Sequence, residues 1–145
     1  EEVLPMKSVV VMYESLLGLL GCSVEWWCVT SGDVRGCATA LREGWNLIDE
    51  MCRDSIPLTL THFERLLAII ATAVRHGQAS LIVAEHVLFR MAAVDLVPSK
   101  RVLSLCCDIM ASSIAQGTAT PVIDAARLSN LWLSASTSFS KSGAP

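Results

Sequence analysis

The chain has 145 residues, of which 52% are hydrophobic and 17% charged, and its formal net charge is −3. This length corresponds to one domain with a core of its own. The negative charge has the wrong sign for a protein that binds nucleic-acid phosphates without sequence preference. The mean hydropathy of +0.51 predicts a compact core rich in small residues, or a surface that partners or further repeats cover.

The first predicted helix runs from Pro5 to about Leu20, because Pro suits a first helical turn. Gly21 is expected to end it. Residues 8–24 are mostly apolar, but Glu14 and two Gly interrupt them and no basic cluster flanks them, so no membrane span is expected. One helical face carries Val9, Met12, Tyr13, Leu16, Leu17 and Leu20.

Residues 22–33 lose the helical period and are predicted to form an insertion in the first hairpin, partly extended in conformation. Trp26 and Trp27 point in different directions in a helix or in a strand, so at least one of them is expected to be exposed. The two Trp side chains either cover the open end of the core or anchor a partner protein, since Trp is enriched where binding energy concentrates.

One pattern occurs twice between residues 36 and 98. Gly36 precedes Pro57 by 21 positions, and Gly77 precedes Pro98 by the same 21 positions. We interpret each copy as the second helix of a helical hairpin that opens after Gly and stops before Pro. Between these ends the identical pairs are Ala38 and Ala79, Leu47 and Leu88, and Asp54 and Asp95, which makes Leu47 and Leu88 equivalent buried positions.

The second helix is predicted to have Ser31 or Asp33 as its cap. Gly44 in its middle predicts close approach by a neighbouring helix, because Gly in a helix interior otherwise costs up to about 1 kcal/mol. Its buried face is expected to carry Leu41, Trp45, Ile48 and Cys52.

The third helix is predicted to begin with a capping box made by Thr61 and Glu64. It should end at Gly77 in the left-handed conformation, with His76 as a partner of the helix dipole. A fourth helix is expected from residue 79 or 80 to Ala93, and its many apolar residues predict neighbours on several sides.

A fifth helix is expected to open at Ser99 and to end at Gly117, and a sixth to run from Thr120 to about Leu133. Residues 135–145 are rich in Ser and are predicted to form a flexible tail. The predicted fold is all-α: a short α-solenoid of about three antiparallel helical hairpins over residues 1–134.

No catalytic, cofactor or metal site is predicted. The six Cys include no Cys-x-x-Cys pair and the three His are isolated. Neither a Gly-x-Ser-x-Gly motif nor a phosphate-binding glycine loop is present. The Cys residues are interpreted as reduced core thiols, which favours an intracellular, reducing compartment: cytoplasmic or nuclear, with the mitochondrion also open. Because no initiator Met or signal-like start is present, we expect a piece of a longer protein.

The hairpin ends resemble pentatricopeptide repeats, paired helices related to the tetratricopeptide repeat. The similar strings lie within residues 36–100: Leu47-Ile48-Asp49-Glu50-Met51 before Ile56-Pro57, Leu88-Phe89-Arg90-Met91 before Val97-Pro98, and the segment from Thr61 to Gly77. The resemblance implies that hairpins stack into a solenoid. It also implies RNA as a ligand class, since members that read RNA do so with small polar residues on their first helices.

We therefore expect a non-enzymatic helical-repeat module for protein–protein interaction or assembly within a larger protein, through a protein partner or self-association. Candidate interface residues are Trp26, Trp27 and Trp132. The alternatives are an RNA-binding pentatricopeptide-like module, with Lys100 and Arg101 as contacts, and an accessory domain that positions a catalytic domain.

Overall fold

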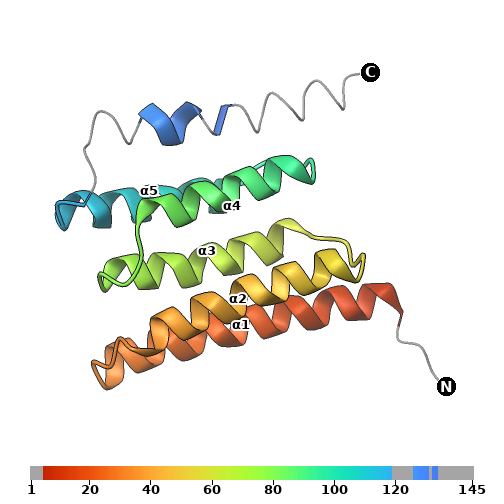
Figure 1. Ribbon diagram of the computed structural model, residues 1–145, viewed down its shortest axis with the longest axis horizontal. Helices are drawn as coiled ribbons and strands as arrows, with labels where there is room; N and C mark the ends of the chain where they lie inside the picture. The colour runs from red at the N-terminus through yellow and green to blue at the C-terminus, as the bar shows by residue number, and fades with distance from the viewer. Residues whose placement is uncertain (1–4, 119–125, 131, 134–145) are drawn as a thin grey trace.

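The computed structural model describes residues 5–118, 126–130 and 132–133 (Figure 1). Five helices follow one another: α1 (Met6–Thr30), α2 (Gly36–Arg53), α3 (Leu60–Arg75), α4 (Leu81–Ala93) and α5 (Lys100–Ala115). Residues 126–130 and 132–133 are also helical. The part of the chain that the structure describes contains no strand, which confirms the predicted all-α class. The predicted start of the sixth helix at Thr120 and the predicted tail at 135–145 lie outside the described residues.

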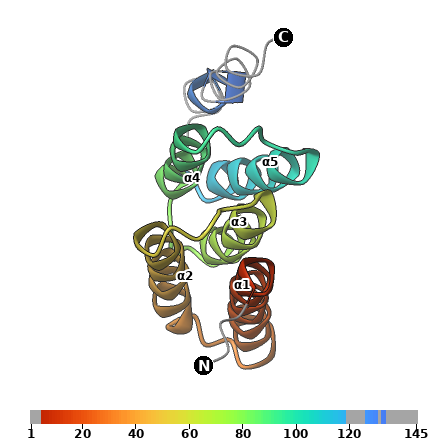
Figure 2. The same cartoon turned by 90° about the vertical axis from the view of Figure 1, so that its right-hand side faces the viewer.

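The centre of the molecule is α3, which packs against α1, α2, α4 and α5. Figure 2 shows α1, α3 and α5 in one layer, with α2 and α4 beside them in a second layer. The first layer is continuous because α1 packs on α3 and α3 on α5. Phe63, Leu66, Leu67 and Ile70 of α3 are fully buried, so this one helix supplies the middle of the hydrophobic core.

The turns that follow α2 and α4 have the same structure, 40 residues apart. Ser55 and Asp95 both adopt the left-handed conformation, with φ of 57° and 58°. The next N–H groups, of Ile56 and Leu96, donate to the carbonyls of Met51 and Met91 at 2.8 and 2.9 Å. These bonds satisfy carbonyl groups that the helix end would otherwise leave without a partner.

The turns that follow α3 and α5 also match at a separation of 40. Gly77 and Gly117 have φ of 72° and 73°, which confirms the left-handed cap predicted at Gly77. Gln78 N–H donates to the Ala73 carbonyl at 2.7 Å, and Thr118 N–H donates to the Ser113 carbonyl at 2.9 Å. The turns that follow α2 and α3 therefore recur 40 residues later, after α4 and α5.

This structural register differs by one residue from the predicted one. At a separation of 40 the counterpart of Leu88 is Ile48, and both are buried, whereas Leu47 is only partly buried. The prediction that Leu47 and Leu88 are equivalent is therefore wrong. Repeated Gly and Pro residues are poor markers of register, because each can occupy several positions in a turn: Gly36 begins α2, while Gly77 follows the end of α3.

The predicted end of the first helix at Leu20 is wrong, as is the extended conformation predicted for residues 22–30, because α1 continues to Thr30. Gly21 does not end the helix because its backbone lies against α3, where an added Cβ would be 3.6 Å from Ile69 Cγ1. Beyond it, Val24 and Cys28 are buried. The first hairpin is longer than the second because its helices are longer: α1 and α2 have 25 and 18 residues, and α3 and α4 have 16 and 13.

The predicted caps of two helices are also wrong. α2 begins after Arg35 rather than after Ser31 or Asp33. α3 begins after Thr59, two residues before Thr61, and its capping box pairs Thr59 with His62 rather than with a carboxylate. The ring of His62 performs the role that Glu or Gln performs in the usual motif.

The close approach predicted at Gly44 is confirmed, since an added Cβ would lie 2.9 Å from Leu66 Cδ1. Ile48 is buried as predicted, but Cys52 is exposed and Leu41 and Trp45 are only partly buried. Ala40, Gly44 and Met51, each one position before a residue of the predicted face, are buried instead. The buried residues of α2 are Cys37, Ala40, Gly44, Ile48 and Met51.

Candidate interaction surfaces

Residues of α1 can be matched with residues of α3 by the contacts that each helix makes with the next helix of the first layer. Thr59 Oγ1 donates to Glu14 Oε1 of α1 at 3.0 Å, and Ser99 Oγ donates to Glu64 Oε1 of α3 at 2.7 Å. Since Thr59 and Ser99 are the caps of α3 and α5, Glu14 and Glu64 are equivalent. The sequence contains a signal for this, because aromatic-Glu-x-Leu-Leu occurs at Tyr13–Leu17 and again at Phe63–Leu67.

His62 joins α3 to α1. Its Nδ1 accepts from the Thr59 N–H at 2.9 Å, so the proton lies on Nε2, which donates to the Val10 carbonyl at 3.0 Å. The side chain is fully buried, and this burial lowers its pKa. Arg65 adds a second link through its hydrogen bond to the Glu14 carbonyl. These contacts define the face by which α3 packs on the preceding hairpin.

The same face of α1 is exposed. On α3 the residues of this face, His62, Leu66 and Ile69, are all 0% exposed. Their counterparts on α1 lie 50 positions earlier and are 43%, 38% and 64% exposed: Met12, Leu16 and Leu19. The three side chains lie in one row because i, i+4 and i+7 share a helical face. We call the row Met12, Leu16 and Leu19 the α1 stripe.

Trp26 and Trp27 continue the apolar surface of α1 beyond the length that α3 has. They are 57% and 50% exposed, so both project from the core. Their ring centroids are 5.3 Å apart and their planes are inclined by 84°, an edge-to-face pair. Each ring therefore leaves apolar surface in contact with water.

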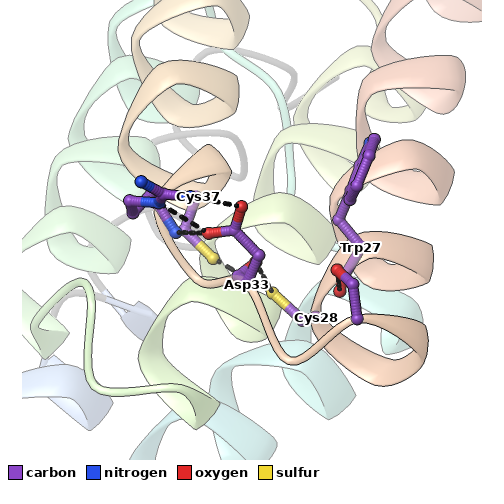
Figure 3. Close-up of polar contacts among 6 residues, drawn as sticks. Trp27, Cys28, Asp33 and Cys37 are labelled. Carbon is purple, nitrogen blue, oxygen red and sulfur yellow. Dashed lines mark hydrogen bonds and ion pairs between the residues drawn. The ribbon is translucent and has the colours of Figure 1, made fainter.

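The loop that closes this hairpin is held by polar contacts (Figure 3). Asp33 accepts from the Arg35 backbone N–H at 3.0 Å and from its Nε at 3.1 Å, and the hydrogen bond from Arg35 lowers the pKa of Asp33. Below it, the buried sulfur atoms of Cys28 and Cys37 are 3.4 Å apart. The loop therefore fixes the ends of α1 and α2 beside the two Trp side chains.

Two of the buried thiols lie in environments that favour their protonated form. Burial raises the pKa of Cys37 to about 11 and that of Cys106 to about 12, so both remain protonated at neutral pH. Within the described residues no group of three or more His, Cys, Asp or Glu side chains converges on a point. The interpretation of all six Cys as core thiols is half wrong, because Cys22, Cys52 and Cys107 are exposed.

A second apolar surface lies at the other end of the molecule. A groove of about 580 Å³ lies between α5 and the helical residues 126–130 and 132–133, and the partly buried Trp132 lines it. We call it the α5 groove. The residues that α5 contributes to it are Leu103, Cys106, Cys107, Met110, Ala111 and Ile114.

A third cluster, which sequence reasoning missed, joins α2 and α4. Arg90 lies 5.7 Å above the ring of Trp45 and pairs with Asp49 at 3.1 Å. Phe89 beside it is 58% exposed. The sequence signal was the Phe and Arg that follow Leu88.

The two residues proposed as RNA contacts, Lys100 and Arg101, are exposed in the first turn of α5. Arg101 borders a cleft of about 640 Å³ that also reaches Arg65 and Glu25. Arg65 is already engaged with the Glu14 carbonyl, and Glu25 offsets positive charge. The cations therefore do not form a continuous basic strip along this cleft.

α1 is long and apolar enough to cross a membrane by length and composition, the only such helix within the described residues. In the structure it packs on α2 and α3.

Comparison of the chain with models of protein families, with curated proteins and with solved structures gives no significant match. The class of protein that the described residues define is all-α, with two turns that recur at a separation of 40 residues.

Proposed function

We propose that the chain is a short α-solenoid of about three hairpins, similar in geometry to pentatricopeptide repeats, and a non-enzymatic module for protein–protein interaction or assembly within a larger protein. The recurrence of both turns at 40 residues supports the solenoid. A scaffold of this kind displays surfaces, and its function depends on what those surfaces contact.

The observation that carries the proposal is the exposed apolar surface of α1, made by the α1 stripe together with Trp26 and Trp27. Contiguous exposed apolar patches are rare on monomeric soluble proteins and mark interaction sites. Trp and Met are also enriched in protein interfaces, while charged residues are depleted from interface cores. A protein surface is therefore the ligand class that this face fits best.

RNA binding is the alternative, and the cleft bordered by Arg65 and Arg101 is the observation that favours it. An RNA groove usually combines a basic track with aromatic stacking platforms. Trp26 and Trp27 are the only Trp residues in the described part of the chain that are at least 50% exposed, and both lie on α1. Because the α1 surface is apolar rather than basic, the protein ligand remains our proposal.

The test is site-specific photo-crosslinking in cell extract. A photoreactive residue at Leu19 should give covalent adducts that protease digests and nuclease does not change. The matched control is the same residue at Asn46, which is exposed on α2 and should give little adduct. Nuclease-sensitive adducts at Leu19, or equal yields at the two sites, would contradict the proposal.

A further inference from the structure

Each helix of the first layer has a backward face, on the side of the preceding helix of the layer, and a forward face, on the side of the next one. On α3 the backward face, His62, Leu66 and Ile69, packs on the preceding hairpin. On α5 the residues 40 positions later, Val102, Cys106 and Ile109, are equally buried, at 0%, 1% and 0% exposure. On α1 the corresponding residues are the α1 stripe, which is exposed.

The forward faces show the converse. Phe63, Leu67 and Val74 of α3 are 0% exposed within the core that α5 completes. Their counterparts 40 residues later are Leu103, Cys107 and Ile114 of α5. All three are exposed and line the α5 groove, Leu103 at 44% and Ile114 at 37%. The groove is thus the position at which a further helix of this layer would lie.

In the part of the chain that the structure describes, one end of the layer therefore has a helix face that lies in no groove, and the other end has a groove that holds no helix. Within the described residues α1 is the one helix of this layer whose backward face is not packed in a groove. The hydroxyl-to-carboxylate contacts that join neighbouring helices of the layer also change at its two ends. Ser104 of α5 replaces the carboxylate that α1 and α3 have at this position. Pro5, the cap of α1, has no hydroxyl group that could donate to a carboxylate.

We propose that the occupant of the α5 groove is α1 of a second copy of this chain, so that copies associate head to tail and continue the stacking of α1, α3 and α5. This rests on the proposed function and names its partner. The contact is heterologous: it uses two different surfaces, so each copy keeps one free end and chains of copies can grow.

The internal stacking also predicts which residues meet. Gly21 of α1 lies against Ile69 of α3. The counterpart of Ile69 on α1 is Leu19, and the counterpart of Gly21 on α5 is Ala111, which is exposed in the groove. Leu19 of one copy is therefore expected to contact Ala111 of the next.

The first experiment is sedimentation equilibrium of the full chain over a range of concentrations. The average mass should rise with concentration and continue past the dimer. Leu16→Glu with Leu19→Glu should weaken association by at least about tenfold, and so should Cys107→Glu with Ile114→Glu. Mixing the two double variants should restore one-to-one dimers that do not grow, because each variant retains the end that the other has lost.

Val29→Glu is the matched control, since Val29 is 73% exposed on α1 but lies off the stripe, and it should leave the mass unchanged. A second measurement uses milder substitutions, in a background where the exposed Cys22, Cys52 and Cys107 are Ser. With an added mild oxidant that accepts the two electrons and two protons, Leu19→Cys mixed with Ala111→Cys should form an intermolecular disulfide, and Val29→Cys mixed with Ala111→Cys should not.

A chain that stays monomeric at all concentrations would overturn the second copy as partner. Association that the groove variant retains would also overturn it, because α1 would then pair with α1. In either case heterologous protein adducts at Leu19 in the photo-crosslinking experiment would still support the proposed function. The two proposals can therefore fail separately.

Discussion

At the scale of single residues, His62 has the most demanding environment. Its two ring nitrogens have opposite roles: Nδ1 accepts from Thr59 and Nε2 donates to Val10. Protonation would place a hydrogen on Nδ1 facing the Thr59 N–H and would charge a buried side chain. Burial above all disfavours the charged form, and Arg65 adds to this effect, whereas the hydrogen bond to the Val10 carbonyl and the nearby Glu14 favour the charged form. The neutral imidazole is thus part of the folded structure.

This environment predicts acid sensitivity. Because the pKa of His62 is lowered in the folded state, the unfolded chain binds more protons. The stabilisation is complete above the unfolded value of about 6.5 and is lost as pH falls from there toward the folded pKa. His62→Gln should cost about 1–3 kcal/mol at pH 7.5. Its deficit relative to the wild type should shrink at pH 5.5.

Urea unfolding at the two pH values measures both effects. The matched control is His86→Gln, since His86 is exposed on α4 and its substitution should leave the stability nearly unchanged. A deficit for His62→Gln that is the same at both pH values would show that the imidazole is not titrating between them.

At the scale of helices, the caps are also the links between hairpins. Thr59 and Ser99 each accept from a backbone N–H of their own helix and donate to a carboxylate of the preceding first-layer helix. One hydroxyl group therefore begins a helix and positions it on its neighbour. This explains why the helices start where they do, two residues before the start that the sequence indicated for α3.

Substitution of the cap tests this double role. Thr59→Ala should destabilise the protein by about 1–3 kcal/mol, because it removes the cap and the charge-assisted bond to Glu14. Thr61→Ala, at the cap that the sequence pattern indicated, should change the stability by less than about 0.5 kcal/mol. Thermal or urea unfolding of the two variants is the measurement. A larger loss in Thr61→Ala would contradict the assignment of the cap.

At the scale of the whole molecule, charge and apolar surface point to different ligands. The net charge is −3, and the exposed Arg101 borders the same cleft as Leu19 of the α1 stripe, where Arg65 and Glu25 also lie. An RNA surface gains its affinity by releasing counterions from the phosphates it contacts. The exposed apolar residues of α1 gain theirs by leaving water, which salt does not weaken.

We therefore expect no specific binding of single-stranded RNA at physiological salt, and no effect of Lys100→Glu with Arg101→Glu. Fluorescence anisotropy with a labelled single strand measures this over a salt series. A surface with about five phosphate contacts would show a log–log salt slope of about −3 to −4. Micromolar binding with such a slope, lost in the double variant, would favour the RNA alternative.

The sequence by itself determined the elements that depend on neighbours along the chain. The helical periods, the left-handed Gly77 and the tolerance of Gly44 for a close neighbour follow from local chemistry, and the all-α class follows from them. Exposure of at least one of Trp26 and Trp27 was also predictable, because adjacent residues of a helix point in different directions.

Only the tertiary structure decided which face of each helix is covered and where each helix stops. Gly21 has the residue type of a helix end, but packing against Ile69 and the burial of Val24 and Cys28 extend α1 to Thr30. Met12 and Leu16 have the pattern of core residues, yet they are exposed because no hairpin precedes them in the described chain. Periodicity gives a helix an apolar side, whereas burial depends on a surface distant in sequence that comes to cover it.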